Sequence, residues 1–404
     1  MGRNRAAVAL LALALLASGC LDHRPPERSA LVLGLGLDVD PEDETQVVVT
    51  QLIVIPSSVA AGSENPSPQP GTAFFLLSSK ATTLEIATAA AGQKLSRIPA
   101  YAHMDALVMG EDFARLGRSV EPAVAWAMRH PEIRPNMFVF VADVSAQYFL
   151  DAQSSLDPLP GEALSHLMDH AEMIPFVYPV RLFEFARGLA SPRQDSALPY
   201  VDRTAPADVQ VPPGFQQQLM VDGTMPNVAQ KTQVQLKGMA IFKGPRMVGL
   251  LTAGDGNGLR WIYGGARSSV SIEHPTVPGA YIVANTVSSS TKRRARFEGE
   301  ELVLSIEIRA TMDAWGLGTT QPVELGSFQD EVHRRLAAAI EADVRRTMAR
   351  LQELKADIFG FGDALYRSAP RDWEKVEQVW DDLYSEARVD VRVDVILKRT
   401  GFLR

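Results

Sequence analysis

A single cysteine, Cys20, is the residue best placed for chemistry in this 404-residue chain. It directly follows the small residues Ser18 and Gly19, which close an unbroken apolar run over 6–17. A short segment with two arginines precedes the run. About a dozen apolar residues suit the central region of a signal peptide and are too few for a helix that crosses a bilayer. The pattern is typical of a bacterial lipobox, in which the thiol is lipidated and cleavage makes Cys20 the new N-terminus.

The lipobox pattern differs from the usual one at a single place. Leucine is preferred three places before the cysteine, where this chain has Ala17 with Leu16 one place earlier. The alternative is a plain secretory signal with an incidental cysteine, but the position of Cys20 after the small pair favours lipidation. A diacylglyceryl group brings two acyl chains, which anchor stably where one chain binds only marginally. We therefore expect everything after Cys20 to be tethered to the outer face of a membrane.

Two histidines four residues apart, His166 and His170, are the next candidates because they could place two imidazoles on one metal ion. The glutamate that zinc proteases carry beside their first histidine is replaced by Leu167, and a third ligand is not evident. A surface or helix-capping pair is the favoured interpretation. His103 is interpreted as a packing residue, so the sequence predicts neither a metal site nor a cofactor.

Other catalytic signatures are missing from the sequence. The chain has neither a G-x-S-x-G nucleophile elbow nor a phosphate-binding G-x-x-x-x-G-K-[ST] loop. Gly34 and Gly36 precede a strand and lack a third glycine, so we interpret them as close backbone packing within a strand. The segment 255–258 (DGNG) lacks the alternating oxygen ligands of a calcium loop and is interpreted as a turn. We predict no catalytic residue and no enzymatic activity.

Two further groups of residues are interpreted as structural. Glu132 and Arg134 form a charge pair in a loop bounded by prolines, which favours a local turn, with a docking surface as the second interpretation. Four scattered tryptophans are expected mostly in the core or at its edge. They are Trp261, Trp315, Trp373 and Trp380.

The composition is that of a globular protein. Hydrophobic residues make up 46% of the chain and charged residues 22%, which is enough for an ordinary core. The net charge of −8 disfavours binding to nucleic acid. Disulfides are excluded, because Cys20 is the only cysteine. After the leader, no stretch approaches the roughly 18 apolar residues of a transmembrane helix.

The first half of the chain follows the leader (1–19) and a polar tether (20–29), and residues 30–189 are predicted to form an N-terminal α+β region. Whether this region is one unit or two stays open. Strands are predicted at 30–39, 46–55, 74–79, 106–109 and 138–142. Helices are predicted at 82–92, from 111, and at 120–129, 145–150, 161–170 and 179–188.

A Pro-rich linker is predicted at 190–232, because 190–216 holds five prolines and few periodic apolar positions. Residues 233–404 are predicted to form a C-terminal α+β domain with an antiparallel-rich sheet and one long amphipathic helix. It begins with a hairpin over 233–251, followed by strands at 280–289, 293–297, 302–308 and 389–395. The long helix, Ser327 to about Leu354, has one apolar stripe, and a shorter helix is predicted at 373–383. Without a regular βαβ alternation, this order favours an α+β fold of two to three mixed domains.

Several short motifs follow one another in a characteristic order. They occupy 33–38 (LGLGLD), 95–97, His103, 108–111, 129–135 (RHPEIRP), 238–243, 248–251, 258–261, 357–362 (DIFGFG), Trp373, Trp380 and 399–401. This order, behind the lipobox, resembles the Ger(x)C family, the lipoprotein C subunits of spore nutrient germinant receptors. The resemblance covers nearly the whole chain, although Leu21 stands where the family commonly has tryptophan.

The resemblance implies a lipid-anchored, non-enzymatic C subunit that is needed for nutrient-triggered spore germination. Such a subunit lies on the outer leaflet of the spore inner membrane and docks on the integral membrane A and B subunits. The alternative is a lipoprotein solute-binding module of a membrane transporter, which predicts two α/β lobes around a cleft. The strand-rich second half with one long helix argues against that alternative. An envelope hydrolase, the third hypothesis, needs a clustered acid pair or a metal site.

Overall fold

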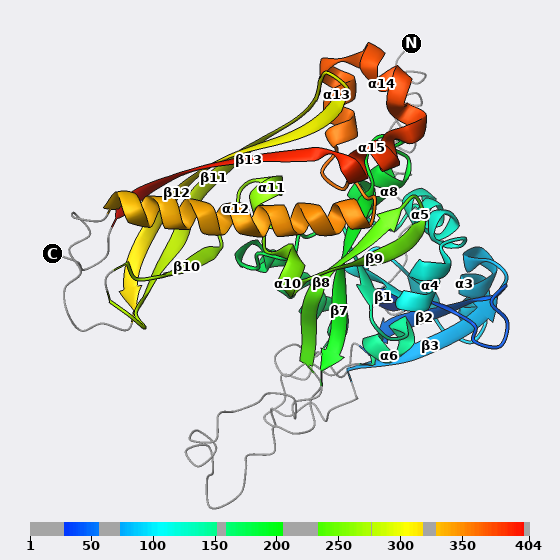
Figure 1. Ribbon diagram of the computed structural model, residues 1–404. Coiled ribbons are helices and arrows are strands. Elements are labelled where there is room, and N and C mark those ends of the chain that lie inside the picture. Colours follow the sequence, from blue (N-terminus) through cyan, green and yellow to red (C-terminus); the bar gives the residue numbers. More distant parts are fainter. Residues whose placement is uncertain are drawn as a thin grey trace, which may run out of the picture.

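The computed structural model of the chain describes residues 28–55, 73–151, 159–204, 233–275, 277–317 and 329–399. These residues build two β-sheets with associated helices, which confirms the predicted α+β class with more than one domain (Figure 1). In the described part of the chain, no helix is both long enough and apolar enough to cross a membrane. The described residues do not include the leader 1–19, Cys20 or the remainder of the predicted tether up to residue 27.

The first sheet has nine strands, in the order β3-β2-β1-β5-β6-β7-β8-β9 with the short β4 beside β1. Its centre, β1-β5-β6-β7, is parallel, and antiparallel strands extend it at both ends. The strands are β1 (Ser29–Val39), β2 (Val47–Val54), β3 (Phe74–Ala81), β4 (Ile98–Ala100), β5 (Ala106–Gly110), β6 (Phe138–Ala142), β7 (Ser196–Thr204), β8 (Gln233–Lys243) and β9 (Arg246–Thr252).

Helices connect and cover the parallel centre. All five residues of β5 and all five of β6 are buried, as expected for strands covered on both faces. The chain passes from β5 to β6 and from β6 to β7 through helices, which gives two βαβ units. The predicted elements included the first unit, and the second was missed because β7 was assigned to the linker. The helices of this half are α3 (Leu84–Gly92), α4 (Glu111–Leu116), α5 (Val120–Arg129), α6 (Ala146–Leu150), α7 (Pro160–Asp169), the 3₁₀ turn η2 (Ala171–Met173) and α8 (Leu182–Leu189).

The glycine-rich part of β1 lets α6 approach the sheet closely. A Cβ atom on Gly36 would lie 2.9 Å from Cδ1 of Leu150 and 3.1 Å from Cβ of Ala146, both in α6. Two residues further along, the buried Asp38 carboxylate accepts the backbone N–H groups of Ala146 (2.7 Å) and Gln147 (2.9 Å). A carboxylate stabilises the first turn of a helix through these otherwise unpaired donors. The close-packing interpretation is thus confirmed for Gly36, whereas a Cβ atom on Gly34 would make only ordinary contacts.

The second sheet has the order β10-β11-β12-β13, antiparallel except for the β12–β13 pair. β11 is one continuous strand of 18 residues, so the prediction of separate strands at 280–289 and 293–297 was wrong. Pairing with β12 holds the polar residues between them in the strand. The strands are β10 (Ser269–Glu273), β11 (Tyr281–Glu298), β12 (Glu301–Leu317) and β13 (Arg388–Arg399).

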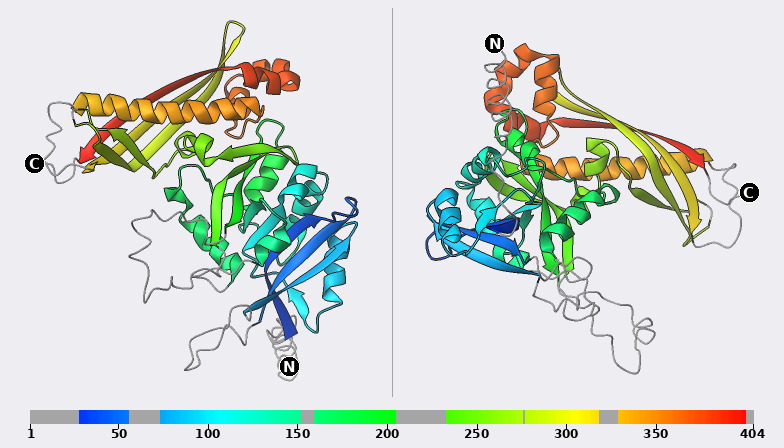
Figure 2. Two further views of the ribbon diagram at one scale, coloured as in Figure 1. Left: turned by 60° about the horizontal axis from the view of Figure 1, so that its bottom comes forward. Right: turned by 180° about the vertical axis from the view of Figure 1, so that it is seen from behind.

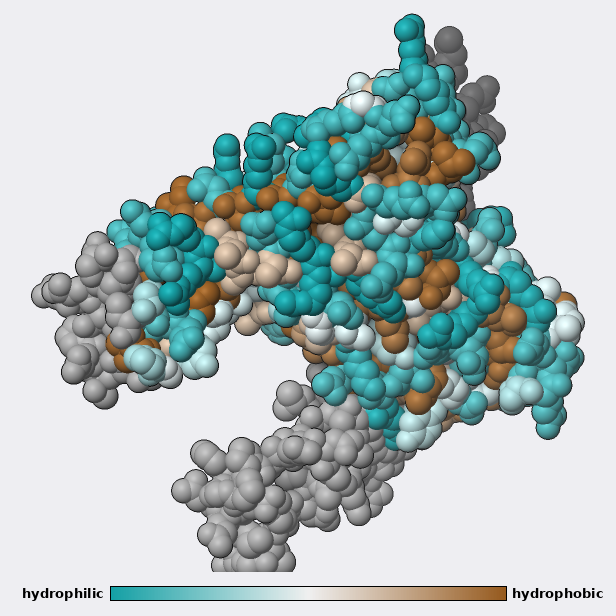
Figure 3. All heavy atoms as spheres, viewed as in Figure 1, coloured by the Kyte–Doolittle hydropathy of each residue, from teal (hydrophilic) through white to brown (hydrophobic). Residues whose placement is uncertain are grey.

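The long helix α12 (Gln329–Glu353) lies along the second sheet and reaches the first, as Figure 2 shows from two further sides. Figure 3 shows hydrophobic residues along the edge where α12 meets β13. Its predicted apolar stripe is confirmed, because its described members are all buried: Val332, Leu336, Ile340, Val344, Met348 and Leu351.

Short helices connect α12 to β13 in the chain and gather at one end of the second sheet (Figure 1). The helix predicted at 373–383 is broken, because η5 interrupts it. Trp373 and Trp380 are buried with ring centroids 5.2 Å apart, and Trp261 is buried as well, as predicted. The side chain of Trp315 lies outside the described residues. The elements are α13 (Phe361–Ser368), α14 (Pro370–Val376), the 3₁₀ turn η5 (Glu377–Val379) and α15 (Trp380–Glu386).

The predicted linker, 190–232, contains a strand of the first sheet, so the linker assignment was wrong for these residues. β7 occupies 196–204, and its first five residues are buried between β6 and β8. Prolines 192 and 199 and the polar residues between them gave this stretch the composition of a loop. The hairpin β8–β9 also joins the first sheet, and the second sheet begins at Ser269. The remainder of the predicted linker, 205–232, lies outside the described residues.

The contact between β1 and α6 can be tested with two alanine substitutions in the same strand. We expect Gly36→Ala to lower the free energy of unfolding by about 1–3 kcal/mol, because the added methyl group overpacks the contact with Ala146. Gly34→Ala is the matched control, since its nearest atoms would lie at 3.5 Å or more. Urea unfolding followed by tryptophan fluorescence measures both, and equal effects would contradict the packing described for Gly36.

Candidate functional site

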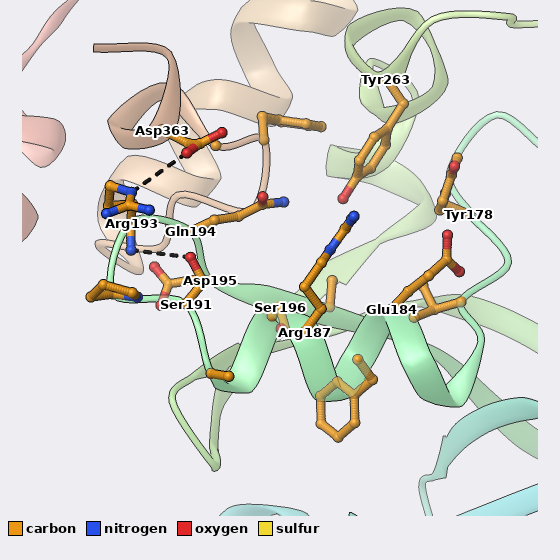
Figure 4. A pocket seen from close by; sticks show the side chains of 18 of the residues that line it. Tyr178, Glu184, Arg187, Ser191, Arg193, Gln194, Asp195, Ser196, Tyr263 and Asp363 are labelled. Carbon is orange, nitrogen blue, oxygen red and sulfur yellow. Dashed lines mark hydrogen bonds and ion pairs between the residues drawn. The ribbon is translucent and has the colours of Figure 1, made fainter. Parts of the chain in front are cut away.

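A cleft of about 710 Å³ lies where the two halves of the molecule meet (Figure 4). One wall is α8 and the loop that follows it toward β7. The opposite wall comes from α11 (Leu259–Tyr263), β11 and the segment around 359–363. Segments far apart in the sequence therefore build this cleft together.

The segment Asp357–Gly362 joins the second half to the loop before β7. Asp195 donates its backbone N–H to the carbonyl of Asp357 (2.9 Å), and Asp357 donates its own to Oδ2 of Asp195 (2.9 Å). Nε2 of Gln194 donates to the carbonyl of Ile358 (2.9 Å). We call residues 193–195 and 357–362 together the latch.

The Asp357 carboxylate is the buried centre of the latch. Only 2% of the residue is exposed, and its two oxygens accept the N–H groups of Phe361 (3.0 Å) and Gly362 (2.7 Å) at the start of α13. Burial raises the pKa of Asp357 to about 6. The two backbone hydrogen bonds oppose this rise, and the neighbouring charge of Asp195 adds to it.

Both glycines of the latch are required by its geometry. Gly360 has φ of +71°, in the left-handed region that favours glycine. A Cβ atom on Gly362 would lie 2.8 Å from the carbonyl oxygen of Arg193 and 2.8 Å from the ring of Trp373. The DIFGFG motif, one of the motifs that carry the family resemblance, therefore fits one half of the protein against the other.

Lys243, at the end of β8, supports the latch from the side. Its Nζ donates to the carbonyl of Lys355 (2.6 Å) and lies 2.7 Å from a carboxylate oxygen of Asp381 and 3.6 Å from Asp195. Burial raises the pKa of Asp195, and the charge of Lys243 opposes the rise. One lysine of the first sheet thus contacts two segments of the second half.

Four arginines line the cleft, although the chain as a whole carries a charge of −8. Arg193 and Arg367 both pair with Asp363, at 3.5 and 3.3 Å. Within the described residues, Arg187 and Arg293 form no ion pair. Neither histidine nor cysteine occurs among the described lining residues. The arrangement suits binding of a polar ligand.

The predicted metal candidates lie apart from the cleft. His166 is in the last turn of α7 and His170 follows it as the C-terminal cap, and both are exposed. The surface or capping interpretation of this pair is confirmed. Among the described residues, no group of three or more His, Cys, Asp or Glu side chains could hold a metal ion. The DGNG segment forms α10 (Ala253–Gly256) and its end, and Asp255 accepts the Thr252 hydroxyl (3.2 Å).

The loop at 129–135 is a structural turn, as favoured. A carboxylate oxygen of Glu132 accepts the backbone N–H of Tyr101 (2.9 Å). The rings of Tyr101, Trp126 and His130 pack together, with centroids 4.9–6.1 Å apart. This motif fixes the chain entering β5 to the end of α5.

Sequence reasoning missed Asp195, Lys243, Arg187 and Arg293 as parts of one site. Asp195 and Asp357 are 162 residues apart, and neither periodicity nor motif spacing connects positions at that separation. The one available signal was the glycine-containing DIFGFG motif, which interrupts a strongly helical pattern.

Two family models match the chain. Residues 22–203 match "Spore germination protein N-terminal domain", and residues 237–401 match "Spore germination B3/ GerAC like, C-terminal". Similar curated proteins come from Bacillus subtilis (strain 168). Putative spore germination protein YfkR is 24% identical over 97% of this chain and 96% of its own length. Spore germination protein KC is 21% identical over 98% of this chain and 95% of its own length.

Among solved structures, the crystal structure of the GerBC protein shares the fold, with a TM-score of 0.55 and 17% identity. The match covers 90% of this chain and 96% of that one. The fold and both matched domains define an α+β spore germination protein. The chain belongs to the Ger(x)C family, the C subunits of spore germinant receptors, as the order of its motifs predicted.

The role of Asp357 in the latch can be tested by changing one of its oxygens to nitrogen. We expect Asp357→Asn to lower the free energy of unfolding by about 1–3 kcal/mol, because the amide nitrogen cannot accept a buried backbone N–H. Urea unfolding at pH 7 measures the change. Asp372→Asn, which removes an exposed pair with Lys375 (2.8 Å), is the control and should change stability by less than about 0.5 kcal/mol.

The difference in unfolding free energy between the wild type and Asp357→Asn depends on pH, and the raised pKa of Asp357 fixes the direction of this dependence. The folded pKa of Asp357 is about 6 and its ordinary value is 3.8, so folding takes up a proton between these two values. The contribution of this carboxyl to stability is therefore greatest near pH 4 and falls as the pH rises to about 6. The advantage of the wild type over Asp357→Asn should be larger near pH 4.5 than at pH 7. An advantage that grows with pH would contradict the raised pKa.

Proposed function

We propose that this chain is a lipid-anchored C subunit of a spore germinant receptor that acts by docking on membrane subunits rather than by catalysis. The observation that carries the proposal is Cys20, the sole cysteine, placed directly behind an apolar leader. The body behind it belongs to the Ger(x)C family over almost its whole length. In this proposal the diacylglyceryl group on Cys20 holds the body on the outer leaflet of the spore inner membrane.

The tether limits how far the body can move from the bilayer. Ser29, where β1 begins, is nine positions after Cys20 in the sequence. A fully extended chain spans at most about 3.6 Å per residue, so the start of β1 stays within about 30 Å of the lipidated cysteine. A folded body held this close to the membrane meets its integral A and B partners in two dimensions, which raises their effective concentration.

Loss of the thiol should release the protein from the membrane. We expect Cys20→Ala to shift the chain from the membrane fraction of spores to the soluble fraction, because the acyl chains have no other attachment site. Immunoblotting of the fractions measures this, and mass spectrometry of the wild type should show an acylated N-terminal Cys20. Ser18→Ala keeps a small residue before the cysteine and serves as the control. Unchanged membrane association of Cys20→Ala would contradict the anchor.

Docking predicts a membrane partner. After crosslinking in spore membranes, affinity purification of the full-length chain should recover the integral A and B subunits of a germinant receptor. Cys20→Ala should reduce this recovery, because the released protein loses its high local concentration at the membrane. Recovery of an importer in place of receptor subunits would instead support the solute-binding alternative.

A further inference from the structure

The Arg293 side chain lies partly buried in the cleft without a counter-ion. It projects from β11, donates one hydrogen bond to the carbonyl of Ile262 (3.1 Å) and has its guanidinium 6.0 Å from the ring centroid of Tyr263. Within the described residues it forms no ion pair. The guanidinium is partly removed from water, and this burial lowers the pKa of Arg293 from its ordinary value. A buried charge is normally paired, and an unpaired one is unfavourable.

A second arginine approaches the same space from the opposite wall. Arg187 lies in the last turn of α8, and Figure 4 shows its side chain reaching into the cleft toward Tyr263. It also forms no ion pair within the described part of the chain. The two arginines thus present unused N–H donors from two walls of one cleft.

The acidic residues of the cleft have other partners. Asp363 pairs with Arg193 and Arg367. Asp195 accepts the Asp357 N–H in the latch. Oε2 of Glu184 accepts the backbone N–H of Arg181 at the start of α8 (2.9 Å). None of these carboxylates is paired with Arg187 or Arg293.

An aromatic surface completes the cleft. The rings of Tyr178 and Tyr263 stack with centroids 4.3 Å apart and planes inclined by 21°. The volume of about 710 Å³ lies within the usual range for sites that hold small molecules. Guanidinium groups bind carboxylates through paired hydrogen bonds, and ring faces accept flat apolar groups.

We propose that the cleft between α8 and β11 binds a small ligand through its carboxylate, with Arg293 and Arg187 as the binding residues and Tyr178 and Tyr263 as the apolar surface. A singly charged carboxylate suits the cleft better than a dianionic phosphate, because Glu184 and Asp195 also line it. This proposal goes beyond anchoring and docking and depends on neither.

Calorimetric titration of the full-length lipidated chain in detergent tests the proposal with benzoate and acetate as probes. We expect benzoate to bind with a Kd near or below about 1 mM, and acetate more weakly because it lacks the ring. Benzamide, the neutral analogue of the same shape, should not bind measurably. All titrations are made at one ionic strength, since surface charge effects depend on salt.

Substitutions in β11 and α8 identify the site. Arg293→Gln and Arg187→Gln should each weaken benzoate binding by about tenfold or more, because each removes charge-assisted hydrogen bonds. Arg294→Gln is the matched control, because Arg294 is the next residue of β11, lies on the opposite face of the strand and pairs with Glu307 (2.9 Å). This substitution should leave the Kd unchanged. Arg187 is exposed, so its variant keeps the test valid even if Arg293→Gln fails to fold.

Four results would overturn the proposal. The first is no binding of either carboxylate up to about 20 mM, well above a weak-site Kd. The second is benzamide binding as tightly as benzoate. The third is an equal effect of Arg294→Gln and Arg293→Gln. Tighter binding of inorganic phosphate than of benzoate would also overturn the assignment of a carboxylate.

Discussion

The Asp357 carboxylate accepts two backbone N–H groups at the start of α13, while the backbone of the same residue pairs with Asp195 across the junction of the two halves. Burial raises the pKa of this carboxyl, so the junction keeps a group that is costly to ionise. The residues around Asp357 are constrained by this junction. Glycine is required at 360 and 362, and the 193–195 loop must keep its position against residues 357–362. The cleft with Arg187 and Arg293 lies beside this junction.

The motifs that carry the resemblance to the Ger(x)C family fix one helix, strand or loop against another. Asp38 holds the start of α6 on β1, and Glu132 holds the backbone of Tyr101 beside the end of α5. Asp357 joins the two halves. Asp38 and Glu132 each accept backbone N–H groups from a segment distant in sequence, and at the junction of the two halves the Asp195 carboxylate accepts the Asp357 N–H. A buried or half-buried acceptor of this kind fixes position precisely, since leaving it unpaired costs about 1–3 kcal/mol. The role of these motif residues is therefore structural: they hold neighbouring elements in place.

Local patterns predicted much of the fold. The buried runs of β5 and β6, the amphipathic stripe of α12 and the alternation of β13 each depend on neighbouring residues, and all were predicted. β7 was missed because Pro199 and the polar residues before it resemble a loop, while its burial depends on β6 and β8. The cleft was missed for the same reason. Its residues come from segments far apart in the sequence, and the hydrogen bond from Gln194 to Ile358 joins two of these segments across 164 positions. Charge pairing over such separations leaves no periodic signal.

The length of β11 has a mechanical consequence. Thr291 donates its hydroxyl to the Trp261 carbonyl, and ten residues further back the strand begins at Tyr281. At about 3.3 Å per residue this arm is about 33 Å long, and β12 pairs with it throughout. A stiff arm of that length acts as a lever. By geometry alone, a rotation of about 5° about Thr291 would displace the far tip by about 3 Å.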